Sequence, residues 1–220
     1  MAEIFTKEQA IEFIKPNSTL MIGGFGNVGI PRRLVSKIAD MPSEIYGLTL
    51  IVNDLGTPGV GLGRLVSNKQ IKKAIGSYFS YNPDAVTAYH RGELDLKLMP
   101  QGNMAEAIRA GGAGLGGFYS PVGVGTELEG SDNKVINGKE YTFVEALRAD
   151  FAMIHAYKAD TLGNLVYNKA AGNFNPLMAM AAKFTIAEAE EIVEAGALPP
   201  AEIATPFVYV NALVKVERGE

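Results

Sequence analysis

The stretch that decides the fold is Thr19-Leu20-Met21-Ile22-Gly23-Gly24-Phe25-Gly26-Asn27-Val28-Gly29-Ile30-Pro31. Its first four residues are mostly apolar, which is typical of a buried strand. Four glycines follow within seven residues, and Pro31 suits the first position of a helix because its missing N–H needs no partner there. We therefore predict a strand over residues 19–22, a glycine loop over 23–29 and a helix from Pro31 to about Asp40. Because glycine has no Cβ, such a loop can bring its backbone close to a ligand.

The rest of the first half alternates between apolar runs and helical patterns. Strands are predicted at residues 48–53, 71–75 and 94–99, and helices at residues 83–89 and 103–110. A glycine-rich loop is predicted over residues 56–63. Strands that alternate with helices imply an open, mainly parallel sheet flanked by helices, which is an α/β fold. We expect one domain over residues 1–220.

The second half contains a β-hairpin and further strands. Asn137-Gly138, inside residues 134–141, predicts a type I′ turn between two strands. Short buried strands are predicted at residues 151–156, 184–189 and 207–210. At the other end of the chain, a capping box that begins at Thr6 predicts a helix, and Pro16 is expected to end it.

Composition and charge exclude several classes of protein. The 220 residues are 47% hydrophobic, which is enough for a sizeable core, and the net charge of −4 argues against nucleic-acid binding. The absence of cysteine excludes disulfides, thiolate nucleophiles and zinc–thiolate sites. There is no apolar run of about 18 residues and no signal-peptide pattern. We therefore expect a soluble, cytoplasmic protein that does not bind membranes.

Few side chains in this sequence suggest chemistry of their own. The two histidines are too scattered for a metal site: His155 lies in an apolar strand, as a satisfied core histidine would, and His90 lies near a helix end. No G-x-S-x-G nucleophile motif is present. The acidic run over residues 188–191 is interpreted as a solvated surface. The sequence therefore gives little support to a metal-dependent or triad mechanism.

One motif favours a nicotinamide cofactor. The segment from Gly24 to Gly29 matches G-x-G-x-x-G, and Asp54 follows the next predicted strand, where dinucleotide-binding folds place an acid. An NAD-binding oxidoreductase is therefore one hypothesis. The match covers only six residues, in a chain that has 25 glycines.

A longer pattern supports another hypothesis. Gly23-Gly24-Phe25, followed by Gly29 and Pro31, resembles the alpha-subunit signature of family I coenzyme A transferases. Further segments resemble alpha subunits in the same order, at residues 51–54, 100–102, 107–118, 123–126 and 173–176. Two positions depart from the family: Pro16 stands where an acid or Asn is usual, and Gly172 stands where relatives commonly carry Arg.

This resemblance implies an enzyme that works with a partner. Such enzymes move CoA from an acyl-CoA to a short-chain carboxylic acid, of the acetate, butyrate or acetoacetate type, through a glutamyl-CoA thioester. The nucleophilic glutamate belongs to the beta subunit, in a Glu-Asn-Gly segment that this chain lacks. No catalytic residue, cofactor or metal is therefore expected here; CoA and acyl-CoA are substrates. Glu127 is a weaker local candidate, and a non-catalytic acyl-CoA-binding protein is another alternative.

The partner implied by the resemblance is a beta subunit. We expect two alpha and two beta subunits, because closed twofold assemblies are the commonest oligomers.

The resemblance also assigns site residues. Residues expected to bind CoA are Gly23, Gly24, Phe25, Gly26, Asn27, Val28 and Gly29. Asn53 and Gln101 follow predicted strands, where ligands of open α/β sheets lie, and their amides could support an oxyanion. The alternative is that Asn53 caps a turn and Gln101 caps a helix.

Two further segments have alternatives of their own. Residues expected to form a pocket wall are Gly116, Gly117, Phe118 and Gly125, within a glycine-rich segment that is otherwise a long surface loop. Residues 173–176, Asn-Phe-Asn-Pro, are expected to cap a helix, with Pro176 at its first position.

Overall fold

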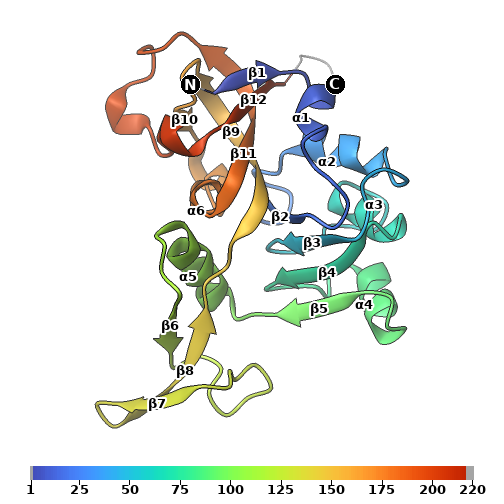
Figure 1. Ribbon diagram of the computed structural model, residues 1–220, viewed down its shortest axis with the longest axis vertical. Coiled ribbons are helices and arrows are strands. Elements are labelled where there is room, and N and C mark those ends of the chain that lie inside the picture. Colours follow the sequence, from blue (N-terminus) through green and yellow to red (C-terminus); the bar gives the residue numbers. More distant parts are fainter. Residues whose placement is uncertain (1, 217–220) are drawn as a thin grey trace.

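A large sheet forms the body of the computed structural model, which describes residues 2–216 (Figure 1). Its strands are β1 (Glu3–Phe5), β2 (Thr19–Ile22), β3 (Leu48–Ile51), β4 (Ile71–Gly76), β5 (Asp95–Leu98), β9 (Ala149–Asp160), β10 (Leu165–Val166), β11 (Ala182–Val193) and β12 (Ala212–Lys215). Their order is β1-β12-β11-β9-β2-β3-β4-β5, with β10 paired to β9. Every pair along this order is parallel, and β10 is antiparallel. The predicted mainly parallel α/β sheet is confirmed.

Helices cover both faces of the sheet. One face packs on α1 (Lys7–Ile11), α2 (Arg32–Ala39), α3 (Leu62–Ser67) and α4 (Pro83–His90); the other packs on α5 (Gln101–Gly112) and α6 (Asn175–Met180). Short 3-10 turns are η1 (Lys169–Ala171), η2 (Pro200–Glu202) and η3 (Phe207–Tyr209). Successive strand residues point to opposite faces, so Leu50 joins one hydrophobic core and Ile51 joins the other. This two-sided burial explains why the strands are apolar runs rather than alternating patterns.

A second, antiparallel sheet stands away from the body (Figure 1). It consists of β6 (Gly117–Ser120), β7 (Asn133–Ile136) and β8 (Lys139–Glu145), in the order β6-β8-β7. We call residues 117–145 the arm. At its hairpin, Asn137 and Gly138 have φ angles of 51° and 77°. Two positive φ values are what a type I′ turn requires, so the predicted hairpin is confirmed.

Two local predictions in the first half were wrong. Helix α1 ends at Ile11 rather than near Pro16, because the chain tightens there: the Ile14 N–H donates to the Ile11 carbonyl, three residues earlier, at 2.9 Å. In the turn that follows, the Ser18 hydroxyl accepts from the Lys15 N–H and donates to the Lys15 carbonyl. The predicted glycine loop over 56–63 ends in helix α3. Position 63 of that helix requires glycine, because a Cβ there would overlap the backbone of Thr57.

The last strand and the second glycine-rich segment also differ from expectation. Residues 207–209 form η3 directly after Pro206, and the strand follows as β12, where it can pair with both β1 and β11. The alternative of a long surface loop is wrong for the start of this segment, because the chain continues α5 to Gly112 and then forms β6, which pairs with β8.

Candidate active site

Polar side chains gather where neighbouring parallel strands end. Asn53 lies two residues after β3, Ser77 directly follows β4, and Gln101 begins α5 after β5. The glycine loop follows β2, whose two neighbours are β3, next along the chain, and β9, much later. At such a switch point the connections diverge to both sides, and ligands of open α/β sheets bind in the crevice that results.

These residues line one cavity of about 440 Å³. Its lining consists of Phe25, Gly26, Asn27, Asn53, Asp54, Gly56, Ser77, Tyr78, Tyr81 and Gln101. The structure thus brings the predicted amides together with the middle of the predicted CoA-binding loop. Val28 is exposed beside this cavity but does not line it.

The amide of Asn53 is held at both ends. Asn53 is buried; its Nδ2 donates to Asp54 Oδ2 at 2.8 Å, and its Oδ1 accepts from the Ser77 hydroxyl at 2.9 Å. Gln101 is exposed, with its Oε1 3.5 Å from the same hydroxyl. The capping alternatives are wrong, because Asn53 bonds two side chains and Gln101 is the first residue of a helix that has no side-chain cap.

The glycine loop has a packed base and an open tip. At the base, a Cβ on Gly23 would overlap Asn175 Oδ1, a Cβ on Gly24 would lie 2.6 Å from Ile30 Cγ1, and a Cβ on Gly29 would lie 2.5 Å from the Ala171 carbonyl. These three glycines therefore allow the loop to pack against the protein itself.

At the tip, Phe25 and Val28 exchange two backbone hydrogen bonds, of 3.0 and 3.1 Å, around Gly26 and Asn27. Gly26 has a φ of +55°, and its N–H donates to Asp54 Oδ2 at 3.0 Å. A Cβ at Gly26 would meet nothing within 4 Å. Gly26 is thus the loop glycine whose Cβ position opens toward the cavity that it lines.

Two asparagines fasten the base of this loop. Asn173 accepts from the Gly24 N–H at 3.1 Å and donates to the Val28 carbonyl at 3.1 Å. Asn175, fully buried, donates to the Gly29 carbonyl at 2.9 Å and accepts from the His155 N–H at 3.1 Å. The predicted helix does begin in this segment, as α6, with Pro176 in its first turn, but the predicted capping role was wrong because α6 has no side-chain cap. Its asparagines hold a loop about 150 residues earlier instead.

The predicted pocket wall lies elsewhere. Gly116 precedes the arm, Gly117 and Phe118 are in β6, and Gly125 is in the connection that follows. None of the four lines the cavity that contains Asn53. Their role stays a prediction, as does that of Glu127, which is exposed on the arm. Gly172, at the position where Arg was expected, lies in the turn just before Asn173.

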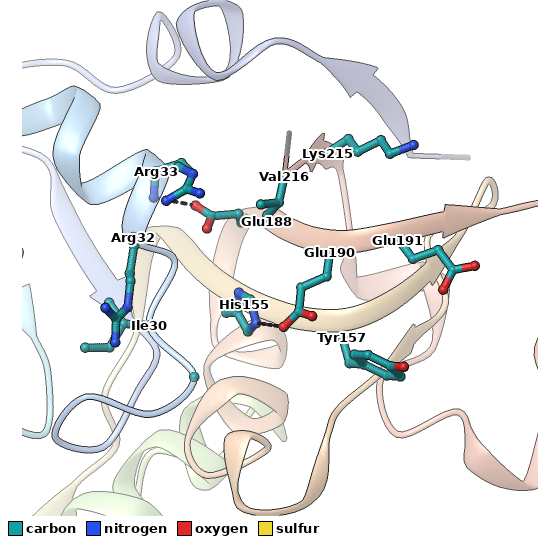
Figure 2. A pocket seen from close by; sticks show the side chains of 11 residues that line it. Ile30, Arg32, Arg33, His155, Tyr157, Glu188, Glu190, Glu191, Lys215 and Val216 are labelled. Carbon is teal, nitrogen blue, oxygen red and sulfur yellow. Dashed lines mark hydrogen bonds and ion pairs between the residues drawn. The ribbon is translucent and has the colours of Figure 1, made fainter. Parts of the chain in front are cut away.

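A buried glutamate accepts hydrogen bonds from the first turn of the helix that follows the glycine loop. Glu188, on β11, is 2% exposed, and its Oε2 accepts from the N–H groups of Arg33 and Leu34 at 2.9 and 3.0 Å. Figure 2 shows its carboxylate directed at the first turn of α2. Burial raises the pKa of Glu188 to about 7, against the opposing effect of these two N–H groups. The interpretation of residues 188–191 as solvated was therefore wrong for Glu188, because α2 covers it.

These contacts disfavour the dinucleotide hypothesis. Dinucleotide folds bind the pyrophosphate at the N-terminus of the helix after the glycine loop. Here the Glu188 carboxylate already accepts from that helix terminus. The acid expected to bind the ribose is also engaged: Asp54 accepts from Gly26, Gly56 and Asn53.

A larger cavity, of about 980 Å³, lies beside Glu188 (Figure 2). One pair of its titratable side chains is in contact: His155 Nε2 lies 3.0 Å from Glu190 Oε1. His155 is half-buried, and its Nδ1 has no hydrogen-bond partner among the described residues. The expectation of a core histidine with both ring nitrogens hydrogen-bonded is therefore only partly met. Over residues 2–216 there is no group of three or more acidic or histidine side chains that could hold a metal.

Sequence reasoning missed Ser77 and the role of Asp54. Ser77 follows β4 as Asn53 follows β3, so the rule that singled out Asn53 applies equally to Ser77. The glycine motif predicts Asp54 as a ribose ligand, whereas in the structure Asp54 accepts hydrogen bonds from both the loop tip at Gly26 and the Asn53 amide. In the described part of the chain, no helix has both the length and the apolar character needed to cross a membrane.

Comparisons of sequence place this chain among known proteins. The family model described as coenzyme A transferase matches residues 5–216. The chain is 48% identical to one subunit of the probable succinyl-CoA:3-ketoacid coenzyme A transferase of Bacillus subtilis, over 95% of this chain and 87% of that protein. It is 42% identical to the alpha chain of the acetate CoA-transferase of Escherichia coli, over 96% of each.

Comparisons of structure show the same fold. An acyl-CoA transferase of Escherichia coli O157:H7, in a thioester complex with CoA, matches with a TM-score of 0.91 at 18% identity. All of this chain is covered, but it spans only 50% of the length of that protein. Glutaconate coenzyme A-transferase of Acidaminococcus fermentans matches with a TM-score of 0.83 at 21% identity, over 99% of this chain and 77% of that one.

Proposed function

This chain belongs to the coenzyme A transferase family, and from that premise we propose that it is the alpha subunit of a heteromeric enzyme that moves CoA from an acyl-CoA to a short-chain carboxylic acid. Relatives that are named as single subunits of such transferases align over nearly its whole length. Their names include acetate and 3-ketoacid transferases, so acetate and acetoacetate are the first acids to test. CoA and acyl-CoA are substrates, and the mechanism requires no cofactor.

The observation that carries this proposal is the pair of amides in one cavity. Asn53 and Gln101 come from the ends of nearby strands and line the same space as the open tip of the glycine loop. A neutral amide N–H stabilises an oxyanion as charge develops on a thioester carbonyl. Such a donor binds the transition state more tightly than the ground state, which is the condition for raising kcat.

The nucleophile would come from the partner. The carboxylate that lines this cavity is Asp54, and both its oxygens already accept hydrogen bonds. A glutamate of the beta subunit would attack the thioester carbonyl; the C–S bond breaks, CoA leaves as thiolate and an acyl-glutamyl anhydride remains. The thiolate then attacks the glutamyl carbonyl and releases the acyl group as a free carboxylate. The acceptor acid reverses both steps on the resulting glutamyl-CoA thioester.

The mouth of the cavity supports a partner at this place. Phe25, Tyr78 and Tyr81 line it and are 49%, 53% and 57% exposed. Large aromatic side chains are enriched at protein interfaces, where a partner removes their apolar surface from water. We propose that the beta subunit covers this rim, within an assembly of two alpha and two beta subunits.

Reconstitution tests the proposal. The purified chain alone should be inactive, and with its beta subunit it should transfer CoA between acetyl-CoA and labelled acetate or acetoacetate. Turnover by the single chain would contradict the division of labour. Absence of turnover with the partner, together with acyl-CoA binding, would favour a non-catalytic binding protein. Calorimetric titration with NAD should show no binding.

Substitution of Asn53 and Gln101 tests whether their amides take part in the reaction. Asn53→Ala and Gln101→Ala should each lower kcat about 10²-fold, as loss of an oxyanion donor does in other enzymes. Assembly with the beta subunit, measured by size-exclusion chromatography, should be unchanged. Near-normal turnover in both variants would remove the amides from the mechanism.

A further inference from the structure

We propose that Ser77 is a positioning residue that sets which end of the Asn53 amide faces the substrate. The inference rests on the proposed function, since it assigns a role to Ser77 in that same site. The Ser77 hydroxyl donates its one hydrogen to the side-chain oxygen Oδ1 of Asn53 and lies near the side-chain oxygen Oε1 of Gln101. The N–H end of the Asn53 amide is thereby left for the thioester oxygen.

An amide side chain has two nearly isosteric ends, one that donates and one that accepts. Rotation by half a turn exchanges them with almost no change in shape. In an oxyanion site the difference is decisive, because an amide oxygen would repel the charge that an N–H stabilises. A site that relies on amides therefore needs neighbours that distinguish the two ends.

Asn53 has one such neighbour at each end. An ionised carboxylate accepts but cannot donate, so Asp54 Oδ2, at 2.8 Å, selects the Nδ2 end. The Ser77 hydroxyl, at 2.9 Å, supplies the hydrogen that the Oδ1 end needs, and the Asn53 backbone carbonyl, at 3.3 Å, is the more distant acceptor. In the part of the chain that the structure describes, the second Nδ2 hydrogen has no acceptor. This hydrogen is the one available to substrate.

The position of Ser77 is itself fixed by Asn53. The Ser77 N–H donates to the Asn53 backbone carbonyl at 3.1 Å, which continues the pairing of β3 with β4 beyond the strand ends. Burial of Ser77 is intermediate, so its hydroxyl lies between the core and the cavity. Backbone and side chain thus hold the two residues in one relative orientation.

Gln101 is held more weakly. Its Oε1 lies 3.5 Å from the Ser77 hydroxyl, at the limit of a hydrogen bond, and the residue is exposed. Because a hydroxyl has a single hydrogen, its bond to Asn53 takes precedence. Ser77 should therefore couple strongly to Asn53 and weakly to Gln101.

The experiment uses the reconstituted alpha–beta enzyme. Ser77→Ala should lower kcat about tenfold, the equivalent of one lost hydrogen bond of about 1.4 kcal/mol, with KM for acyl-CoA nearly unchanged. Ser77→Thr keeps the hydroxyl and should restore most of the loss. Ser80→Ala is the matched control, because Ser80 is an exposed serine three residues away that does not line this cavity. Melting temperatures and assembly are measured for every variant.

A double-mutant cycle separates positioning from general damage. In the Asn53→Ala background, Ser77→Ala should cost almost nothing further, because no amide remains for it to orient. In the Gln101→Ala background it should still cost most of its tenfold. Full kcat for Ser77→Ala, or losses that add in the Asn53→Ala background, would overturn the inference. If Asn53→Ala itself retains turnover, it is the amide mechanism of the proposed function that fails.

Discussion

The base of the glycine loop is buried, whereas its tip is exposed to the cavity. Gly23 and Gly24 are buried and packed so closely that a Cβ would overlap or crowd their neighbours, while Gly26 has free space in that direction. The base is held by Asn173 and Asn175, and the tip is held by Asp54. One glycine motif therefore serves two physical purposes, close packing of protein on protein and a backbone turn that leaves room for a ligand.

Substitution at the base should have the largest effect. Gly23→Val places side-chain atoms where Asn175 lies, and overpacking at a rigid buried site costs about 1–3 kcal/mol or more. We expect little soluble folded protein, measured by urea unfolding and by yield. Gly102→Ala is the control, because a Cβ there meets nothing within 4 Å and should be neutral or slightly stabilising. A Gly23→Val chain with wild-type stability would mean that the base is not rigid.

The second prediction concerns removal of the Asn175 side chain, which holds the base of the loop. Asn175→Ala would leave the His155 N–H and the Gly29 and Ala171 carbonyls without a partner, at a cost of about 3 kcal/mol in the free energy of unfolding. The same change makes room at Gly23, so Gly23→Ala should cost less in the Asn175→Ala background than in the wild type. Urea midpoints of the four proteins measure this coupling. Strict additivity would show that the two residues do not share space.

Substitution at the tip should affect binding and spare stability. Asn tolerates positive φ, so Gly26→Asn keeps the turn but adds a side chain at the cavity. We expect KM for acyl-CoA to rise about tenfold, or 1.4 kcal/mol, with the unfolding midpoint almost unchanged. Gly92→Asn is the control: Gly92 also has a positive φ and open space, but it follows α4, away from the cavity. Equal KM values for both variants would contradict a ligand at the tip.

The last prediction concerns the pH dependence of stability and Glu188, which contacts helix α2 directly after the base of the loop. The folded-state pKa of Glu188 is raised to about 7 from an ordinary value of 4.5, so between these values the folded state binds more protons than the unfolded state. Its contribution to stability is therefore fully present below pH 4.5 and is lost as pH rises through 7.

Glu188→Gln tests this pH dependence. Gln cannot ionise, so the stability of the variant relative to the wild type should rise by about 2.5 kcal/mol between pH 5 and pH 8. Urea unfolding of both proteins at several pH values measures the difference. A constant difference across that range would mean that Glu188 is ionised throughout.

The sequence allows the frame of the fold to be predicted, because the deciding patterns are local. The strand, glycine loop and helix around residues 19–40 need only their own neighbours to be recognised, as does the turn at Asn137-Gly138. The placement of Asn53 and Gln101 at one edge follows from the parallel sheet. These two residues do line one cavity, although their chemical roles stay predictions.

What could not be predicted depends on residues distant in the chain. Glu188 and Glu190 lie on the same face of β11, yet only Glu188 is buried, because helix α2, 155 residues earlier, covers it. Asn173 and Asn175 have the residue types of a helix cap, and only the folded chain shows that they hold the glycine loop. The strand expected at residues 207–210 moves to β12 for the same reason: its partners β1 and β11 decide its position.

The strand order also has a consequence for synthesis of the chain. Among the described residues, β1 pairs only with β12, so Glu3 has no strand partner until Ala212 has been synthesised. β2 gains its neighbour β9 only after more than a hundred further residues have been added. Contacts so distant in sequence make folding slow, because the intervening chain must be ordered before they form. A nascent chain that stops before residue 212 would carry unpaired, apolar strand edges. Ribosome-bound chains of increasing length should therefore resist proteolysis only once β12 has emerged, and until then they should be good clients for chaperones.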